Sequence, residues 1–317
     1  MTEFGLGMFS ADGRPGFPGL VVDGRVHDLR EPFGNALTTR ALLEDWTNAL
    51  PRLRELAASP VGDGVALDQL RPLPPVDPPG QVLCAGANYF QHLRQIAYSM
   101  GRVDGDERSE EERRAAADEI AAKRAEDDPF IFAMVPSALC GANDDVVLWG
   151  PGHKHDWELE LAVVIAGGGR DIAASAAMEH IAGFTACNDI STRDVMFRPG
   201  FPMTDFLMSK GRPTFKPIGP YIVPREFVTD YRSLRIELKV NGEVMQDESV
   251  DDIVHGIESL VSYASRVVTL APGDVLLTGS PAGNAGHHGD RWLVPGDVMD
   301  GQISGLGPMR NRCVEAP

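Results

Sequence analysis

The chain has 317 residues and carries 46 Asp and Glu residues against 29 Lys and Arg residues, for a formal net charge of −17. So acidic a balance disfavours DNA, RNA and anionic membranes as partners, because proteins bind those surfaces through Lys and Arg that displace counterions. No apolar run approaches the length of a transmembrane helix, and the first residues lack the features of a signal peptide. The four cysteines form no CxxC pair, so we expect a reduced, cytoplasmic protein.

The chain divides into two predicted units. Residues 1–72 read as a small N-terminal domain and residues 81–317 as a larger catalytic one. The segment between them, 73–80, contains four prolines, which indicates a stiff linker. Within the first unit, apolar side chains over 39–56 recur at helical spacing, although Pro51 should break or kink that helix.

The second unit opens on a predicted strand at 81–86, followed by a turn with Asn88 and a short helix carrying His92. Such a turn often presents a catalytic base, although a lone histidine is more commonly a surface or core residue. Residues 101–128 are dominated by Glu, Arg and Ala, which predicts a charged helical insertion. This insertion is expected to be solvated, with a lid over the site as the competing hypothesis.

Three acids lie where carboxylates are expensive to bury. Asp156, Glu158 and Glu160 lead into the apolar run 161–165, which predicts a strand, and alternation places Glu158 and Glu160 on one face. Asp189 follows a second apolar run. Glu158, Glu160 and Asp189 together would form an all-oxygen site for a hard divalent ion such as Mg²⁺, Mn²⁺ or Ca²⁺. The alternative is a half-exposed edge strand with a solvated acidic face.

Two further signals mark turns and strands. Asp23-Gly24 and Asn241-Gly242 each lie between short apolar runs, which favours tight β-hairpins. Residues 273–281 read as a buried strand that enters a glycine-rich loop. The sequence contains no glycine pattern of a nucleotide phosphate loop.

In this order the motifs resemble the fumarylacetoacetate hydrolase family. The matching segments are Gly86-x-Asn88-Tyr89-x-x-His92, Asp156-x-Glu158-x-Glu160, Asn188-Asp189-x-x-x-Arg193-Asp194, Lys210, and Gly273 to Gly283. The resemblance covers most of residues 73–310. It implies an α+β, mostly β fold, a mixed β-sheet roll with a small N-terminal domain, and a homodimer.

The resemblance also implies a metal centre and the residues around it. Mg²⁺, or Mn²⁺ or Ca²⁺ in its place, would be held by the matched positions Glu158, Glu160 and Asp189. The implied catalytic positions are His92, Gln95, Arg193 and Lys210. The implied substrate-binding positions are Tyr89, Met196, Thr278 and Gly279. A small-molecule keto acid can chelate such an ion, which stabilises an enolate while His92 acts as general base.

Some positions have a competing interpretation. Arg193 would hold a substrate carboxylate, or it would form an internal ion pair with Asp194 or a metal-ligating acid. His287 and His288 lie in the glycine-rich loop, where exposed residues are expected. A role for them as an alternative base is the second hypothesis.

The chain departs from the family pattern at four places. Gln95 stands where the family has an acid three residues after the histidine, so His92 should be a weaker base. Met134 and Met196 replace a lysine and a glutamine, and 211–213 replaces Ser-Phe-Asp with Gly-Arg-Pro. These exchanges remove groups that would grip a small dicarboxylate. We therefore expect a larger, more apolar substrate than acylpyruvate, or a reaction without activated water.

The resemblance first suggests a divalent-metal-dependent hydrolase that cleaves a C–C bond in a β-dicarbonyl, acylpyruvate-like acid through an enolate. A decarboxylase, isomerase or hydratase of a 2-oxo acid would use the same site and is the alternative. The third hypothesis is a non-catalytic homologue that acts as a binding protein.

Overall fold

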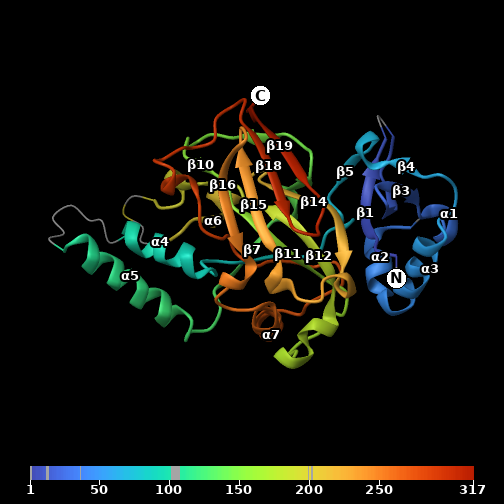
Figure 1. The fold of residues 1–317 in the computed structure, drawn as a ribbon, viewed down its shortest axis with the longest axis horizontal. Coiled ribbons are helices and arrows are strands. Elements are labelled where there is room, and N and C mark those ends of the chain that lie inside the picture. Colours follow the sequence, from blue (N-terminus) through green and yellow to red (C-terminus); the bar gives the residue numbers. More distant parts are fainter. Residues whose placement is uncertain (1, 12–13, 36, 101–107, 199, 201–202) are drawn as a thin grey trace.

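Two β-sheets form the body of the protein, and most helices lie at its periphery (Figure 1). The computed structural model describes residues 2–11, 14–35, 37–100, 108–198, 200 and 203–317. The strands of the larger sheet are β1 Gly5–Ser10, β2 Phe17–Val22, β3 Arg25–Asp28, β4 Val65–Ala66, β5 Arg71–Leu73, β6 Val82–Ala85, β7 Ile131–Met134, β8 Leu139–Gly141, β11 Leu159–Ile165, β12 Ile181–Asn188, β14 Lys216–Pro224 and β17 Val275–Leu277. The smaller sheet contains β9 Val146–Leu148, β15 Arg235–Val240, β16 Glu243–Ser249, β18 Val298–Ile303 and β19 Met309–Glu315. A short separate pair consists of β10 His155–Asp156 and β13 Ser191–Thr192.

Helices account for a smaller part of the described chain. The α-helices are α1 Arg30–Phe33, α2 Thr39–Glu44, α3 Trp46–Ala58, α4 Phe90–Met100, α5 Glu110–Arg124, α6 Phe206–Lys210 and α7 Ile257–Val267. Single 3₁₀ turns are η1 Leu67–Gln69, η2 Pro136–Ala138, η4 Arg193–Val195, η5 Arg225–Phe227, η6 Tyr231–Ser233, η7 Val250–Asp252 and η8 Ala285–His287, and η3 Ala174–His180 is longer. The predicted α+β, mostly β architecture is confirmed.

The strand order places β11 near the middle of the larger sheet. That order is β4-β3-β2-β1-β14-β12-β11-β17-β6-β7, with β5 beside β1 and β8 beside β14. The smaller sheet runs β16-β15-β18-β19-β9. β11 is antiparallel to both β12 and β17, whereas β17 and β6 are parallel, so the predicted mixed sheet is present.

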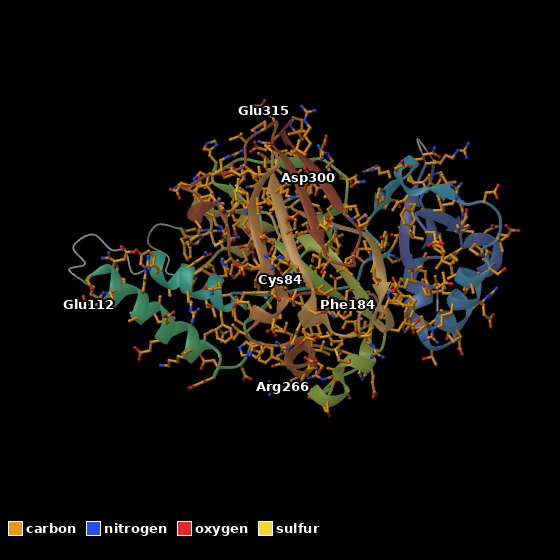
Figure 2. All side chains as sticks on the ribbon, viewed as in Figure 1. Cys84, Glu112, Phe184, Arg266, Asp300 and Glu315 are labelled. Carbon is orange, nitrogen blue, oxygen red and sulfur yellow. The ribbon has the colours of Figure 1, made fainter. Side chains whose placement is uncertain are left out.

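Both faces of β11 are buried. Leu159 and Leu161 belong to the same apolar cluster as Ile236 and Leu238 of β15, and this cluster fills the space between the two sheets. Ala162 and Val164 point to the opposite face and join a second cluster with β6, β14 and β17. Figure 2 shows Phe184 and Cys84 among these sheets, well away from Glu112 on α5. An acid on β11 is therefore held inside the protein, which argues against the edge-strand alternative.

The leading unit packs around its own apolar cluster, formed by β1, β2, α2 and α3. β1 also pairs with β14 at Leu6 and Ile222, which joins this unit to the larger sheet. The division at 73–80 remains a proposal.

The expected break at Pro51 is wrong: the helix is interrupted at Asp45, and Pro51 lies inside α3. The amide of Ala49 bonds to the Asp45 carbonyl at 2.8 Å, so α3 restarts there.

The charged insertion forms α5 over part of its predicted range, because 101–107 lies outside the described residues. Ser109 and Glu112 form a capping box that fixes where α5 begins. α5 lies beside α4 on the side of the molecule away from the leading unit (Figure 1). Arg94 of α4 bonds to Asp118 of α5 at 2.7 Å.

Both predicted hairpins are confirmed. Asp23 and Gly24 connect β2 to β3, and Asn241 and Gly242 connect β15 to β16, with positive φ at all four residues. The four cysteines are buried and free, as expected from their spacing. In the part of the chain that the structure describes, no helix is long and apolar enough to cross a bilayer.

Candidate metal centre and active site

Three carboxylates converge at one end of β11 and β12. Glu160 lies on β11, Glu158 directly precedes that strand, and Asp189 directly follows β12. The antiparallel register brings these segments together, and the Asp189 amide donates to the Glu158 carbonyl at 2.8 Å. One oxygen of each carboxylate lies within 4.8 Å of the others, and all three side chains are buried.

Two buried lysines neutralise part of this charge. The Lys210 ammonium, at the end of α6, donates to Glu158 Oε2 at 2.5 Å and to Asp189 Oδ2 at 2.9 Å. Lys216, the first residue of β14, donates to Asp189 Oδ1 and has a fully buried side chain. Burial alone would lower the pKa of Lys210, but Asp189 and Glu158 hold that pKa above its ordinary value. Lys210 is therefore a cation fixed against Glu158 and Asp189, and Lys216 contacts Asp189 from the other side of that carboxylate.

Arg193 pairs with two acids on the other side. Its Nε donates to Asp156 Oδ2 at 2.8 Å and its Nη2 donates to Glu158 Oε1 at 2.6 Å. Asp194 instead accepts the His153 amide at 2.9 Å, so it is not the partner of Arg193. The ion-pair interpretation of Arg193 thus holds for Glu158. The Arg193 side chain also stays 25% exposed and lines the cavity described below.

Glu160 is the acid of this cluster that does not pair with Lys210, Lys216 or Arg193. It accepts the Gly279 amide at 2.7 Å and makes no ion pair within the described residues. Burial raises the pKa of Glu160 well above its ordinary value, and the charges of Asp189 and Glu158 raise this pKa further. Burial would also raise the pKa of Glu158, but Lys210 and Arg193 hold it below its ordinary value.

The donor set fits a hard divalent cation. Its three carboxylates are buried and close together, and four acids, Asp156 included, face three cations. When all four acids are ionised, one negative charge remains in a region where unpaired charge is costly. An all-oxygen set of this kind suits Mg²⁺, Mn²⁺ or Ca²⁺.

A cavity of about 390 Å³ opens onto the carboxylates. It brings together seven residues that the sequence singled out: His92, Glu158, Glu160, Asp189, Arg193, Met196 and Lys210. They come from α4, the β11 and β12 ends, η4 and α6, which are far apart in the chain. The size suits a small organic molecule.

Three residues predicted to bind substrate do not line this cavity. The Thr278 hydroxyl donates to the Leu161 carbonyl at 3.0 Å. The Tyr89 hydroxyl lies 3.5 Å from the Thr278 hydroxyl. Gly279 holds Glu160 through its amide and has φ +98°, and a Cβ there would meet Asn88 at 2.9 Å. Gly279 thus holds Glu160 in place and Thr278 bonds to β11, while their predicted role in substrate binding, like that of Tyr89, stays a prediction.

His92 lines the cavity with its side chain largely buried. Its Nδ1 atom has no hydrogen-bond partner among the described residues, and burial lowers the pKa of His92 to about 4. Gln95 does not bond to the imidazole, because its Oε1 accepts the Gly283 amide at 3.3 Å instead. The imidazole is thus neutral near pH 7 and without the carboxylate that usually steadies such a ring.

The glycine-rich loop contributes one histidine to the cavity. His287 is exposed, as expected, and lines the cavity rim. The His288 ring lies 2.9 Å from the Met245 carbonyl, away from the lining. His287 therefore remains the second hypothesis for a base.

The sequence analysis did not single out Lys216, and it did not assign Asp156 a role in holding the loop and Arg193 in place. Asp156 accepts the amide of Ala285 at 2.8 Å as well as Arg193, so it connects the loop to the acid cluster. The available signal for Lys216 was a lone lysine at the start of an otherwise apolar strand. A charge in that position needs a buried partner.

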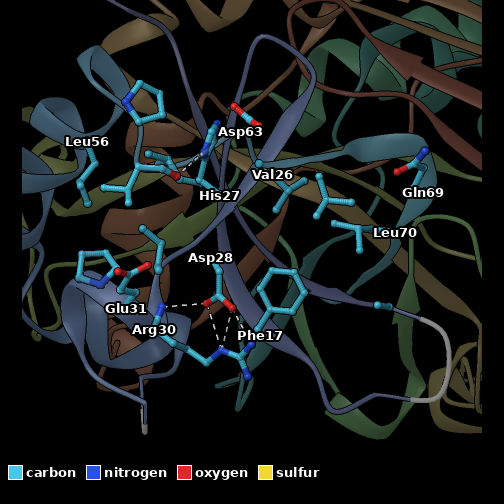
Figure 3. A pocket seen from close by; sticks show the side chains of 18 of the residues that line it. Phe17, Val26, His27, Asp28, Arg30, Glu31, Leu56, Asp63, Gln69 and Leu70 are labelled. Atoms are coloured by element: carbon cyan, nitrogen blue, oxygen red, sulfur yellow. Dashed lines mark hydrogen bonds and ion pairs between the residues drawn. The ribbon is translucent and has the colours of Figure 1, made fainter.

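A second cavity, of about 660 Å³, lies in the leading unit (Figure 3). Two of its charged groups, Arg30 and Asp28, are paired with each other. Arg30 donates to both oxygens of Asp28 at 3.0 Å, and the His27 ring lies 3.2 Å from the Val61 carbonyl. This cavity contains no group of clustered acids comparable to the metal centre in the described residues, so we place the chemistry in the first cavity.

Comparisons with known proteins show the family to which the chain is similar. The family described as Fumarylacetoacetate (FAA) hydrolase C-terminal matches residues 81–314. The chain is 35% identical over 243 residues to oxaloacetate tautomerase FAHD2A, mitochondrial, of Bos taurus, covering 76% of this chain and 69% of the relative. It is 32% identical over 300 residues to oxaloacetate tautomerase Fahd2a, mitochondrial, of Rattus norvegicus, covering 94% and 85%.

Solved structures show the same fold. One is a crystal structure described as a probable 2-hydroxyhepta-2,4-diene-1,7-dioate isomerase from Mycobacterium abscessus. It is 29% identical, covers 99% of both chains and gives a TM-score of 0.75. The fold, the ordered motifs and the matched residues together establish that this chain belongs to the fumarylacetoacetate hydrolase family, a family of enzymes.

Proposed function

We propose that the chain is a divalent-metal-dependent enzyme that interconverts the keto and enol forms of a 2-oxo acid. The observation that carries this proposal is the environment of His92. The residue faces a compact cluster of three carboxylates, yet its Nδ1 has no acidic partner and its pKa is lowered to about 4 by burial. Relatives named tautomerases and isomerases support the same class of reaction.

A ring of this kind suits proton transfer at carbon better than activation of water. Both reactions would turn His92 into an imidazolium without a carboxylate partner, but hydrolysis needs in addition a water molecule held between this base and the distal carbonyl. Enolisation needs only the removal of a C3 proton, which polarisation of the neighbouring keto group makes more acidic. C–C hydrolysis, the reaction first suggested by the motifs, therefore becomes the second candidate.

The carboxylates of Glu158, Glu160 and Asp189 would hold the ion, which supplies a Lewis acid that stabilises negative charge on the keto oxygen. Arg193 lines the cavity and is placed to bind the carboxylate at the reacting end. His92 Nε2 takes the C3 proton as the C–H electrons form the C2=C3 bond. The C2=O π electrons move to the keto oxygen, which takes a proton from solvent to give the enol, and His92 then releases its own proton to solvent. The reverse steps return a proton to C3.

The test measures both reactions in one preparation. Exchange of C3 protons for deuterium, followed by NMR, reports enolisation of pyruvate and oxaloacetate over the enzyme-free rate. Release of pyruvate from acetylpyruvate reports cleavage, and evolution of CO₂ reports decarboxylation. We expect Mg²⁺-dependent exchange that His92→Gln abolishes, without cleavage.

Each alternative predicts a different pattern. Rapid pyruvate release would establish a hydrolase, and CO₂ release a decarboxylase. Binding of these acids without any exchange or product would establish a binding protein. The choice of Mg²⁺, the homodimer and the cytoplasmic location also stay predictions; the bovine and rat relatives are named mitochondrial.

A further inference from the structure

The cavity has two chemically different parts. Its floor consists of Glu158, Glu160, Asp189, Arg193 and Lys210, with His92 beside them. Its mouth is lined by apolar side chains: Ile96, Phe130, Phe132, Met196, Phe197 and Phe206. The keto acid group occupies only the floor, so the mouth must accommodate the rest of the substrate.

Three phenylalanines form one wall of this mouth. The rings of Phe132, on β7, and Phe206, on α6, stack with centroids 4.2 Å apart and planes 14° apart. The Phe130 ring lies 6.1 Å from each of them and stays 46% exposed. An aromatic face kept partly open beside a polar site favours a ligand with an apolar group, because covering it removes apolar surface from water.

The charges around the cavity argue against a second carboxylate on the substrate. Among the described lining residues, the Lys and Arg side chains are Lys210 and Arg193. Lys210 is held by Glu158 and Asp189, and Arg193 by Asp156 and Glu158. Neither faces the phenylalanine wall as a free cation. His287 lines the rim, but burial lowers the pKa of its imidazole, so a carboxylate at the mouth would lose its hydration without gaining a fixed positive partner.

The charge balance of the floor leads to the same substrate. The four acids exceed the three cations by one, so a bound divalent ion would leave a single positive charge. One substrate carboxylate neutralises that charge. A dicarboxylate would add a second negative charge that the floor does not balance.

We propose that the substrate is a 2-oxo monocarboxylic acid whose C3 carries an aryl or bulky alkyl group, seated against Phe130, Phe132 and Phe206. This inference rests on the proposed function for the reacting end, but the apolar site is a separate claim. It differs from the oxaloacetate named for the curated relatives, which is a small dicarboxylate.

Three acids test the proposal by titration calorimetry on the Mg²⁺-loaded protein: phenylpyruvate, pyruvate and oxaloacetate. We expect phenylpyruvate to bind at least about tenfold more tightly than either of the others. Phe130→Ala should weaken phenylpyruvate binding by about three- to tenfold, the worth of an aromatic contact, and leave pyruvate unchanged. Because Phe130 is 46% exposed, this variant should fold, which circular dichroism checks.

Two further variants sharpen the result. Phe130→Arg places a cation at the mouth and should shift the preference toward oxaloacetate. Leu207→Ala is the matched control, because Leu207 is a 64% exposed apolar residue of α6 that does not line the cavity. It should leave all three affinities unchanged.

The outcomes separate the two claims. Oxaloacetate binding as tightly as phenylpyruvate, or equal losses for phenylpyruvate and pyruvate in Phe130→Ala, would overturn the apolar site even if C3 exchange is observed. The expected binding preference without C3 exchange for any acid would sustain the apolar site and overturn the proposed function.

Discussion

The floor and the mouth of the cavity differ in how strongly each side chain relies on its neighbours for stabilisation. In the floor, buried charges are fixed by ion pairs, as with Lys210 between Glu158 and Asp189. In the mouth, apolar rings touch and one of them stays half open. Removing a floor charge leaves its partner buried and unpaired, whereas removing a mouth side chain mainly changes shape. We therefore expect few substitutions in the floor to preserve the reaction, whereas many substitutions in the mouth should change only which substrate is bound.

The largest effect is expected for Lys216→Met. It removes a buried cation from Asp189, which keeps Lys210 as its remaining partner, so the metal-free protein should lose about 3 kcal/mol of unfolding free energy. Urea unfolding measures this change, and added Mg²⁺ should restore part of the loss. Lys239→Met is the control, because Lys239 forms an exposed pair with Glu237 at 2.8 Å and should have little effect. Equal stability of both variants would show that Lys216 does not balance the floor.

The second-largest effect is expected for Glu158→Gln. It removes one charged oxygen donor and leaves Arg193 and Lys210 beside the site with less compensation, so Mg²⁺ affinity should fall by at least about tenfold. Titration calorimetry with Mg²⁺ gives the affinity directly. Glu179→Gln removes an exposed acid outside the cluster and serves as the control. Unaltered affinity in Glu158→Gln would place the ion elsewhere.

The raised pKa of Glu160 predicts a pH dependence for the metal-free protein. Burial raises this pKa well above 4.5, so between that value and the raised pKa the folded state binds a proton that the unfolded state has lost. Stability from this group is present below pH 4.5 and is lost as pH rises through the raised pKa. Melting temperatures across pH should show this decline, which saturating Mg²⁺ or Glu160→Gln should flatten. A decline that persists in Glu160→Gln would have to come from another group.

The smallest effect is expected for Gln95→Ala. The family pattern suggests that this position steadies the catalytic histidine, but the Gln95 amide oxygen accepts the Gly283 amide at 3.3 Å. We therefore expect less than about threefold change in kcat for C3 exchange, with the acid limb of kcat/KM still near the His92 pKa of about 4. A large loss of kcat, or a shifted acid limb, would show that Gln95 acts on His92.

Much of the floor was predictable because its residues lie in short motifs. Glu158 and Glu160 are two residues apart, and their alternation before an apolar run indicates a carboxylate pair without any knowledge of the fold. Asp189 was added because it directly follows a second apolar run, and the family resemblance supports the same assignment. Thr278 and Tyr89 do not line the cavity, and their predicted role in substrate binding stays a prediction, because a motif shows that residues are near a site but not which way their side chains point.

Lys216 and the phenylalanine wall were not predictable in this way. Lys216 lies 27 residues after Asp189 in the chain, and the two meet because β14 pairs with β12. Phe132 lies on β7, Phe130 directly precedes that strand and Phe206 lies on α6, and no sequence spacing connects Phe206 to the other two. Met134 and Met196 did indicate an apolar substrate, and of these Met196 lines the cavity.

The sequence by itself determined the family, the mostly β architecture, both hairpins and the acids of the metal centre, since each depends on local pattern. Tertiary structure alone decided which cation neutralises which acid, which histidine nitrogen lacks a partner, and which rings form the mouth. The physical reason is that burial and electrostatic pairing depend on contacts between distant segments. The register of β11, β12 and β14 sets those contacts.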